Sequence, residues 1–247
     1  MLGPTATRGE GVLAVNSRQL GKRAFDVIVG TVLVIATLPV LVVGAIGTTI
    51  ALRAWPFFTQ VRVGADGQPF KFIKLRTLPV HAPKYTSKYE LAHLHVPRFS
   101  DTLRRLHLDE LPQLYLVVIG KMSLVGPRPE MPYLHAQLSP TFAELRTSVR
   151  PGCTGLWQVS QHCDQMIHEH PEFDERYLAA HSFRLDLWII MRTLRLLLPA
   201  RDKRLVSLTD LPEWAAPNSA RTTITLDQSR EQSRDMADDL LLNTAAD

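Results

Sequence analysis

The sequence contains only two cysteines, Cys153 and Cys163, among its 247 residues. Disulfide-stabilised extracellular domains usually carry more cysteine pairs, so we expect a protein of a reducing compartment. Three histidines, His162, His168 and His170, lie close to Cys163, but a second Cys-x-x-Cys or His-x-x-x-His pair that would complete a zinc site is missing. The sequence therefore argues against structural zinc.

Aromatic residues are also scarce, at 7% of the chain, and the basic residues are not interleaved with them. Because nucleic-acid-binding domains usually combine basic patches with recognisable motifs, we expect no nucleic acid partner. Internal repeats are absent as well. A chain of this length can then form one substantial globular domain with smaller segments attached.

Charge is distributed unevenly along the chain. Residues 202–247 contain nine acidic and five basic side chains, so the net charge of +4 for the whole chain leaves +8 for residues 1–201. A basic body suits phosphates or anionic lipid surfaces. From their polar composition, we expect residues 1–21 to be a mobile lead-in and residues 202–247 to be a poorly ordered acidic tail.

Residues 27–52 form a run of 26 residues without a single charged side chain. A helix of that length can cross a bilayer core of about 30 Å. A cleaved signal peptide fits poorly, because the apolar run is too long and no cleavage site of small residues follows it. We therefore predict a membrane anchor over residues 22–53.

Pro39 lies in the middle of this anchor, where a proline removes a backbone hydrogen bond and bends or breaks a helix. The two arms of about 18 Å and 21 Å are each too short to cross a core of about 30 Å. Lys22 and Arg23 precede the run and Arg53 follows it, which favours a cytoplasmic position for both flanks. The residues alone leave a re-entrant hairpin and a kinked single span open.

A second apolar pattern lies at residues 183–198, where apolar side chains recur at helical spacing between charged ones. This pattern favours an amphipathic helix at the membrane interface. An ordinary surface helix that packs its apolar stripe on the core fits equally well.

The remaining segments predict a helix-rich α/β fold. Residues 56–63 and 70–75 alternate as strands do, and the glycines between them are typical of a hairpin turn. Helices are expected at residues 111–118, 133–137, 141–145, 173–180 and 184–198. We assign residues 54–201 to one domain.

Two adjacent carboxylates, Asp109 and Glu110, lie in the most highly charged part of this domain. Pro112 is tolerated only in the first turn of a helix, so the pair is expected at a helix start, where Asp109 could act simply as a cap. Alternatively, carboxylates flanked by Arg104 and Arg128 can hold Mg²⁺ while the guanidinium groups bind phosphate oxygens. That combination favours phosphoryl transfer.

Prolines restrict the backbone beside two arginines of the same region. Arg128 lies between Pro127 and Pro129, and Arg150 precedes Pro151. A rigid backbone reduces the freedom of the guanidinium group and suits bidentate contact with a phosphate. We expect both arginines to line one site.

In their order and spacing these motifs resemble the bacterial sugar transferase family, the monotopic phosphoglycosyl transferases that begin lipid-linked polysaccharide assembly. The resemblance covers roughly residues 22–193. The matching blocks are Lys22-Arg23 with Asp26; Thr59-Gln60-Val61-Arg62-Val63-Gly64; Phe70; Lys74-Leu75-Arg76-Thr77; Leu108-Asp109-Glu110-Leu111-Pro112-Gln113-Leu114; Met122-Ser123-Leu124-Val125-Gly126-Pro127-Arg128-Pro129; Pro151-Gly152 with Thr154-Gly155 and Gln158; Asp174; Tyr177; Asp186; and Thr193.

The resemblance implies a re-entrant anchor with its break at Pro39 and a catalytic domain, residues 54–201, on the cytoplasmic face of the bacterial inner membrane. It implies transfer of a sugar-1-phosphate from a UDP-sugar to polyprenyl (undecaprenyl) phosphate, with release of UMP. The donor, the acceptor and membrane lipid are the implied partners. A homodimer and downstream glycosyltransferases are further candidate partners.

The resemblance also implies roles for single residues. Asp109 would be the nucleophile that carries the phosphosugar, and Glu110 would coordinate Mg²⁺ with it or orient the acceptor. The residues expected to bind phosphate or substrate are Arg76, Arg104, Gln113, Arg128 and Arg150.

The chain departs from the family pattern at three positions. Leu38 replaces a serine before Pro39, and Leu116 and Lys121 stand where Asn and Asp are usual. Leu116, Lys121 and the acidic tail motivate an alternative, a catalytically silent membrane scaffold of a polysaccharide assembly complex. Because Asp109 is retained, we predict an enzyme.

Overall fold

The computed structural model describes residues 8–84, 96–197 and 205–215, with the side chains of the first helix from Leu20 onward. Within these ranges the protein is helix-rich with two small sheets of two strands each, which confirms the expected class. The helices and strands are α1 (Arg8–Leu52), β1 (Phe57–Val63), β2 (Pro69–Leu75), α2 (Arg98–Arg105), α3 (Gln113–Val118), β3 (Ser123–Val125), α4 (Pro132–His135), α5 (Pro140–Thr147), β4 (Gly152–Thr154), α6 (Glu172–Ala179) and α7 (Phe183–Leu197).

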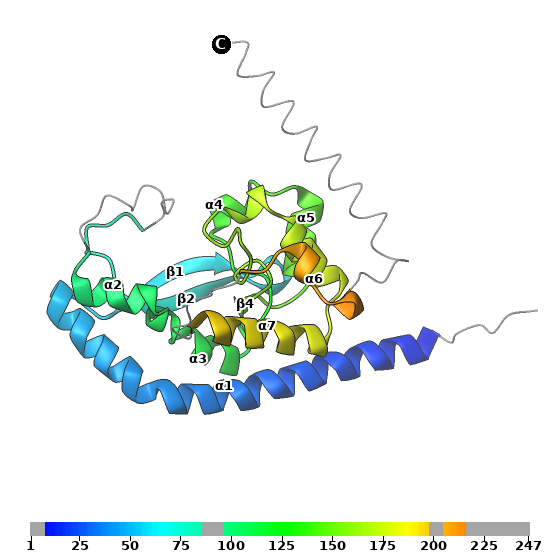
Figure 1. The fold of residues 1–247 in the computed structure, drawn as a ribbon, viewed down its shortest axis with the longest axis horizontal. Coiled ribbons are helices and arrows are strands. Elements are labelled where there is room, and N and C mark those ends of the chain that lie inside the picture. The colour runs from blue at the N-terminus through cyan, green and yellow to red at the C-terminus, as the bar shows by residue number, and fades with distance from the viewer. Residues whose placement is uncertain (1–7, 85–95, 198–204, 216–247) are drawn as a thin grey trace, which may run out of the picture.

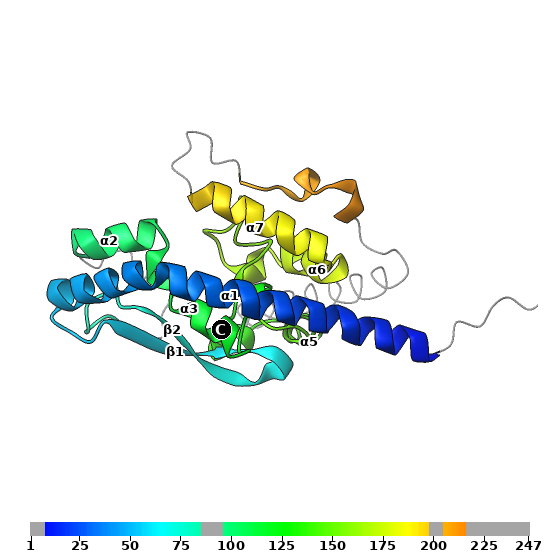
Figure 2. The same cartoon turned by 90° about the horizontal axis from the view of Figure 1, so that it is seen from below.

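Helix α1 runs along one side of the molecule, and the other elements lie on top of it (Figure 1). Seen from below, it crosses the folded domain from end to end (Figure 2). The lead-in that we expected to be mobile is helical from Arg8, and Pro39 lies inside the same continuous helix. Figure 1 shows that α1 is bent in its middle part, so the two arms on either side of Pro39 form one bent helix.

The N-terminal arm of α1 is fixed to the end of α3. Arg23 donates hydrogen bonds to the carbonyls of Val117 and Val118, at 2.6 and 2.8 Å, in the last turn of α3, where a basic side chain is a favourable partner for the carbonyls. About two turns further on, the absence of a side chain at Gly30 lets the helix approach Val117, since a Cβ atom there would lie 3.3 Å from it. A glycine therefore sets the depth at which this arm packs.

The C-terminal arm docks on the same domain. A Cβ atom at Gly44 would lie 2.8 Å from Leu75 in β2, and one at Gly47 would collide with the ring of Phe99 in α2. Both glycines thus allow the helix to approach the domain closely. The two arms of the anchor are held by one folded unit.

The outer face of α1 is apolar and exposed. Leu20–Leu52 is long and apolar enough to cross a membrane, and only 11% of its most apolar window is buried. Helix α7 adds a second exposed apolar stripe while Leu185 and Ile189 on its other face are fully buried. The packing of one apolar face on the core is therefore confirmed, and a position of the other face at a membrane interface stays a prediction. The exposed apolar residues of α7 are Phe183, Leu187, Met191, Leu194 and Leu197.

The predicted hairpin of β1 and β2 is confirmed. The strands are antiparallel, with Phe57 opposite Leu75 and Val63 opposite Pro69. The turn between them has Asp66 and Gly67 in the left-handed region, at φ of 53° and 70°, which closes the chain on itself tightly.

Two features of the fold are absent from the predictions. Helix α2 has a mainly polar sequence, and β3 and β4 are three residues each. These short strands pair in parallel, with Ser123 opposite Gly152 and Val125 opposite Thr154. They lie at the centre of the domain, so a small element with little sequence signal organises the core.

The five predicted helices are all present as α3 to α7, with ends shifted by one or two residues. Part of the predicted tail also belongs to the domain, because Val206 is buried and its N–H donates to the carbonyl of Val159 at 3.0 Å. Residues 216–247 of the predicted tail lie outside the described residues.

Candidate active site

Asp109 and Glu110 lie in a single turn of 3-10 helix, Leu108–Glu110, between α2 and α3. The chain enters this turn through His107, whose left-handed backbone, at φ of 56°, redirects it sharply after α2. Helix α3 begins only after Pro112, which is its N-cap. Asp109 is therefore not the cap of α3, and the simple capping role considered from the sequence does not apply.

Basic side chains from three other elements surround this pair. Arg128 contacts Glu110 with an Nη2–Oε1 distance of 3.2 Å, and Lys74 from β2 and Arg104 from α2 act electrostatically on Asp109. Two predicted phosphate-binding residues, Arg104 and Arg128, are thus placed at the carboxylates. Lys74 was missed.

The two carboxylates differ in their electrostatic surroundings. Burial and the adjacent Glu110 raise the pKa of Asp109, and Lys74 and Arg104 offset this only in part. Burial also acts to raise the pKa of Glu110, but Arg128 and Lys74 outweigh it and leave that pKa below its usual value. Glu110 is thus held as an anion in an ion pair, whereas Asp109 is the less stabilised carboxylate.

The inner face of the hairpin supplies two cations to the interior. Burial lowers the pKa of Lys74, with Asp109 and Glu110 opposing that shift, and burial lowers the pKa of Arg62 to about 10. By the strand register, both side chains share a face with Phe70 and Phe72, which are buried. The strand alternation places Lys74 and Arg62 on the same face as two core phenylalanines, and this pattern could have identified them as buried cations from the sequence.

The segment that carries Arg128 is held by its backbone. Four successive carbonyls, at residues 127–130, each accept a hydrogen bond from a different part of the fold. Their donors are the Gly152 N–H at 2.9 Å, Arg146 Nη2 at 2.7 Å, Arg62 Nη1 at 3.0 Å and the Val63 N–H at 2.9 Å, in that order. Because each acceptor is fixed separately, the segment presents the Arg128 guanidinium from a rigid base.

Glycines allow this segment to approach β4. A Cβ atom on Gly152 would collide with the backbone nitrogen of Gly126 and the carbonyl oxygen of Thr154, and one on Gly155 would collide with the carbonyl oxygen of Gly126. Since the neighbours are backbone atoms, they cannot rotate away. Side chains are thus excluded at the point where the two segments meet.

Arg146 connects this segment to α6. Its Nε lies 2.8 Å from Asp174 Oδ2, and both side chains are almost completely buried. Burial raises the pKa of Asp174, and the Arg146 guanidinium counteracts this. The same guanidinium holds the Arg128 carbonyl, so a buried ion pair supports the active-site backbone.

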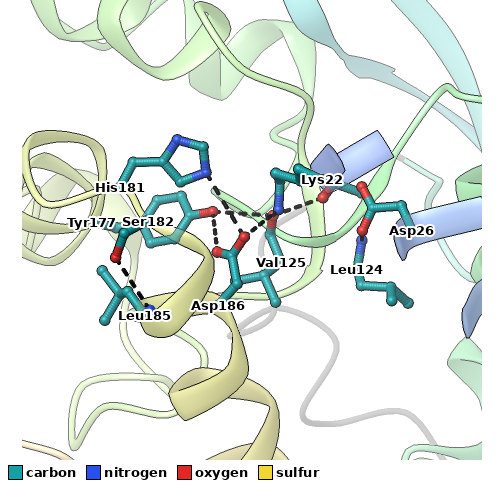
Figure 3. A network of polar contacts seen from close by, with 10 residues as sticks. Lys22, Asp26, Leu124, Val125, Tyr177, His181, Ser182, Leu185 and Asp186 are labelled. Atoms are coloured by element: carbon teal, nitrogen blue, oxygen red, sulfur yellow. Dashed lines mark hydrogen bonds and ion pairs between the residues drawn. The ribbon is translucent and has the colours of Figure 1, made fainter. Parts of the chain in front are cut away.

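A second polar network joins the start of the anchor to β3, the strand that leads into the segment carrying Arg128 (Figure 3). Lys22 lies 2.6 Å from Asp186 Oδ2 and donates to the Val125 carbonyl at 3.2 Å. Tyr177 donates to Asp186 at 2.8 Å, and the Leu124 N–H donates to Asp26 at 3.1 Å. The position of α1 is thereby coupled to the strand that precedes Arg128.

The other predicted site residues lie in different surroundings. Arg76 donates to the Trp55 carbonyl at 3.0 Å and Arg150 to the Gly120 carbonyl at 3.1 Å, so both bind backbone. Gln113 is buried, and its Nε2 has no hydrogen-bond partner among the described residues. Phosphate binding by Arg76 and Arg150 stays a prediction, while Gln113 has a free donor for a ligand.

The departures from the family pattern lie outside the carboxylate pair. Leu116 is buried in the core, Lys121 is exposed, and Leu38 is half exposed on the outer face of α1. The turn Leu108–Glu110 and the cations around it are formed by other residues.

The carboxylates of Asp109 and Glu110 fit the requirements of a Mg²⁺ site. No group of three or more His, Cys, Asp or Glu side chains in the described parts of the chain is arranged to hold a metal. Mg²⁺ is often bound by one or two carboxylates together with substrate phosphates and water. Hard oxygen ligands beside phosphate-binding cations match that pattern.

Comparisons with known proteins place this arrangement in a family. The model of a family described as bacterial sugar transferase matches residues 17–200. The exopolysaccharide production protein ExoY of Sinorhizobium fredii is 32% identical over 197 residues, which cover 71% of this chain and 84% of the relative. The UDP-galactose-lipid carrier transferase of Erwinia amylovora is 33% identical, over 75% of this chain and 42% of the relative.

A further relative is the UDP-glucose:undecaprenyl-phosphate glucose-1-phosphate transferase of Klebsiella pneumoniae, which is 34% identical over 70% of this chain and 39% of its own length. This chain thus spans less than half the length of two of the three relatives and most of the length of ExoY. The family match confirms the resemblance that the motifs predicted: the chain belongs to the bacterial sugar transferase family.

Proposed function

We propose that this protein transfers a sugar-1-phosphate from a UDP-sugar to polyprenyl phosphate, releases UMP, and so begins the assembly of a lipid-linked glycan such as an exopolysaccharide. The observation that carries the proposal is the buried carboxylate of Asp109, next to Glu110 and facing Lys74, Arg104 and Arg128. The relatives support the two substrates, since one of them is named as a UDP-glucose:undecaprenyl-phosphate glucose-1-phosphate transferase.

In the first step, a carboxylate oxygen of Asp109 attacks the β-phosphorus of the donor. The bond from that phosphorus to the bridging oxygen of the α-phosphate breaks, and UMP leaves with the electron pair. Asp109 suits this role because it is the carboxylate that no arginine pairs with directly, whereas Glu110 is engaged by Arg128. Lys74 and Arg104 offset the charge that develops on the phosphate oxygens.

In the second step, a phosphate oxygen of the polyprenyl acceptor attacks the same phosphorus. The bond to Asp109 breaks, the carboxylate is restored, and polyprenyl diphosphosugar is released. Mg²⁺, held by Asp109 and Glu110, would neutralise phosphate charge when bound. The rigid segment around Arg128 keeps its guanidinium in place for both steps.

The acceptor is a lipid, so the site must lie at a membrane surface. A re-entrant anchor on the cytoplasmic face of the inner membrane is supported by the docking of both arms of α1 on one folded domain. A helix that spanned the bilayer would carry one arm away from that domain. The exposed apolar faces of α1 and α7 then enter the same leaflet.

The test is UMP release by the full-length protein in detergent or nanodiscs, with Mg²⁺, undecaprenyl phosphate, and UDP-glucose, UDP-galactose or UDP-N-acetylglucosamine. We expect release with at least one donor and none with Asp109→Asn, which keeps the shape of the side chain but removes its charge. Absence of UMP with every donor would favour the silent scaffold. A homodimer and contacts with downstream glycosyltransferases stay predictions.

A further inference from the structure

A cavity of about 150 Å³ lies beside the catalytic carboxylates and shares Arg128 with them. Its walls come from the end of β1, the segment after β3, α4 and the loop after β4. The residues that matter here are Arg62, Arg128, Glu130, Met131, Leu134 and Trp157. The reaction steps described above use only Arg128 of this set, so the cavity has a separate role.

Two residues of this wall each carry a buried hydrogen-bond donor without a partner among the described residues. Trp157 is 6% exposed, and its indole Nε1–H has no hydrogen-bond partner among the described residues. The same holds for Nε–H of Arg62, whose Nη1 is engaged by the Pro129 carbonyl. An unpaired buried donor is costly, so two of them in one wall indicate a ligand that brings acceptor oxygens.

The cavity also contains an acceptor and apolar surface. Glu130 is buried, and its carboxylate interacts electrostatically with Arg62 and Arg128. Met131 and Leu134 are buried apolar residues. A ligand with hydroxyl groups around its edge and nonpolar C–H groups on its faces would satisfy both kinds of surface.

Size restricts the ligand further. A cavity of about 150 Å³ in another protein holds one benzene molecule, so a space of this size takes a single six-membered ring. The walls are also preformed: Met131 Sδ accepts a hydrogen bond from Gln60 Nε2 at 3.1 Å, and the Glu130 carbonyl accepts one from the Val63 N–H at 2.9 Å. The cavity therefore selects by shape as well as by polarity.

We propose that this cavity binds the sugar ring of the UDP-sugar donor and that Trp157, Arg62 and Glu130 determine which sugar is accepted. The inference rests on the proposed function. Arg128 borders both the cavity and the carboxylates, so a ring in the cavity lies next to the phosphate that Arg128 binds. In a UDP-sugar the sugar is attached directly to the reacting β-phosphate, whereas the uracil ring is separated from it by the α-phosphate and the ribose.

The experiment measures equilibrium binding to the full-length protein in nanodiscs, in the Asp109→Asn background so that the donor is not consumed. The probes are UDP, UDP-glucose, UDP-galactose and UDP-N-acetylglucosamine, with Mg²⁺. Trp157→Phe keeps an aromatic ring but removes the indole N–H. We expect it to weaken the preferred UDP-sugar roughly tenfold, the equivalent of one buried hydrogen bond, and to change UDP binding less than twofold.

Trp214→Phe is the matched control, because Trp214 stacks on Arg184 outside the cavity, and it should leave all four affinities unchanged. If Trp157→Phe does not fold, as judged by thermal melting, Leu134→Phe is the second variant: it reduces the space in the cavity, leaves the hydrogen bonds that hold the Arg128 segment in place, and should show the same selective loss. Equal weakening of UDP and UDP-sugar would assign the cavity to the nucleotide and overturn the proposal, as would unchanged binding of all probes. Failure of the proposed function is separate: it would appear as intact binding without UMP release by the wild-type protein.

Discussion

At the scale of single residues, the ammonium group of Lys74 shows how the fold brings charge to the site. Lys74 shares the inner face of the hairpin with the buried Phe72, and its charge acts on Asp109 and Glu110. Its neighbour Lys71 is exposed on the opposite face. Strand alternation therefore separates a lysine beside the two carboxylates from a solvated one three residues away.

Replacing Lys74 with methionine removes this charge while retaining much of the side-chain volume. We expect kcat for UMP release to fall about a hundredfold, comparable to the loss of one donor that stabilises a developing negative charge. Lys71→Met is the matched control and should stay within twofold of wild type. Equal activity of the two variants would exclude Lys74 from the site.

Arg146 supports the site through the backbone instead of through the substrate. Arg146→Met leaves the Asp174 carboxylate and the Arg128 carbonyl without their shared donor, and we expect a loss of about 3 kcal/mol or more in the free energy of unfolding. The control is Arg105→Met, which breaks the ion pair with Asp101. This pair is at the surface, with the Arg105 side chain 71% exposed and that of Asp101 47% exposed. That change should cost less than about 1 kcal/mol in denaturant unfolding. Similar losses would contradict the supporting role of Arg146.

The candidate carboxylate pair could be singled out from the sequence because its signal is local. Asp109 and Glu110 are adjacent, and Pro112 indicates the nearby helix start. Arg62 and Arg146 could not be found in this way, since their backbone partners Pro129 and Arg128 are 67 and 18 residues distant. Contacts of that kind exist only once the chain has folded.

At the scale of elements, the pairing of β3 with β4 fixes the segment around Arg128. The hairpin of β1 and β2 could be predicted because its strands are seven residues long and its turn contains two glycines. The pair β3–β4 has three residues per strand and joins positions 29 residues apart, from Ser123 to Gly152. Strands of three residues are too short to show a hydrophobic period in the sequence, so their pairing is determined by tertiary packing.

The glycine at the centre of this pairing gives an element-scale prediction. Gly152→Ala places a methyl group against the backbone of Gly126 and Thr154, and overpacking of this kind costs about 1–3 kcal/mol. Because the Gly152 N–H also holds the Pro127 carbonyl, Arg128 should be displaced and UMP release should fall at least tenfold. Stability is measured by denaturant unfolding and activity by UMP release.

The control for this variant is Gly21→Ala in α1, where a methyl group meets no atom within 4 Å. There alanine should be neutral or should stabilise the helix by about 0.5–1 kcal/mol. If Gly152→Ala were as stable and active as Gly21→Ala, the close approach of the two segments would not be required.

At the scale of the whole molecule, helix α1 is bent and both α1 and α7 expose apolar faces, which supports the proposed re-entrant anchor. A re-entrant anchor places both of its flanks on the same side of the membrane. After Cys153 and Cys163 are replaced by alanine, single cysteines introduced at positions 18 and 71 should react with a membrane-impermeant maleimide from the same, cytoplasmic side. Labelling from opposite sides would show that the anchor spans the bilayer.

In the proposed mechanism Asp109 carries the phosphosugar between donor and acceptor, and mass spectrometry of the protein can detect that intermediate. With the preferred UDP-sugar and Mg²⁺ but no polyprenyl phosphate, the protein should gain the mass of one phosphosugar on the peptide that contains Asp109. The adduct should disappear when the acceptor is added, and Asp109→Asn should not form it. UMP release that requires the acceptor, with no adduct at any time, would instead show direct transfer and would contradict the account.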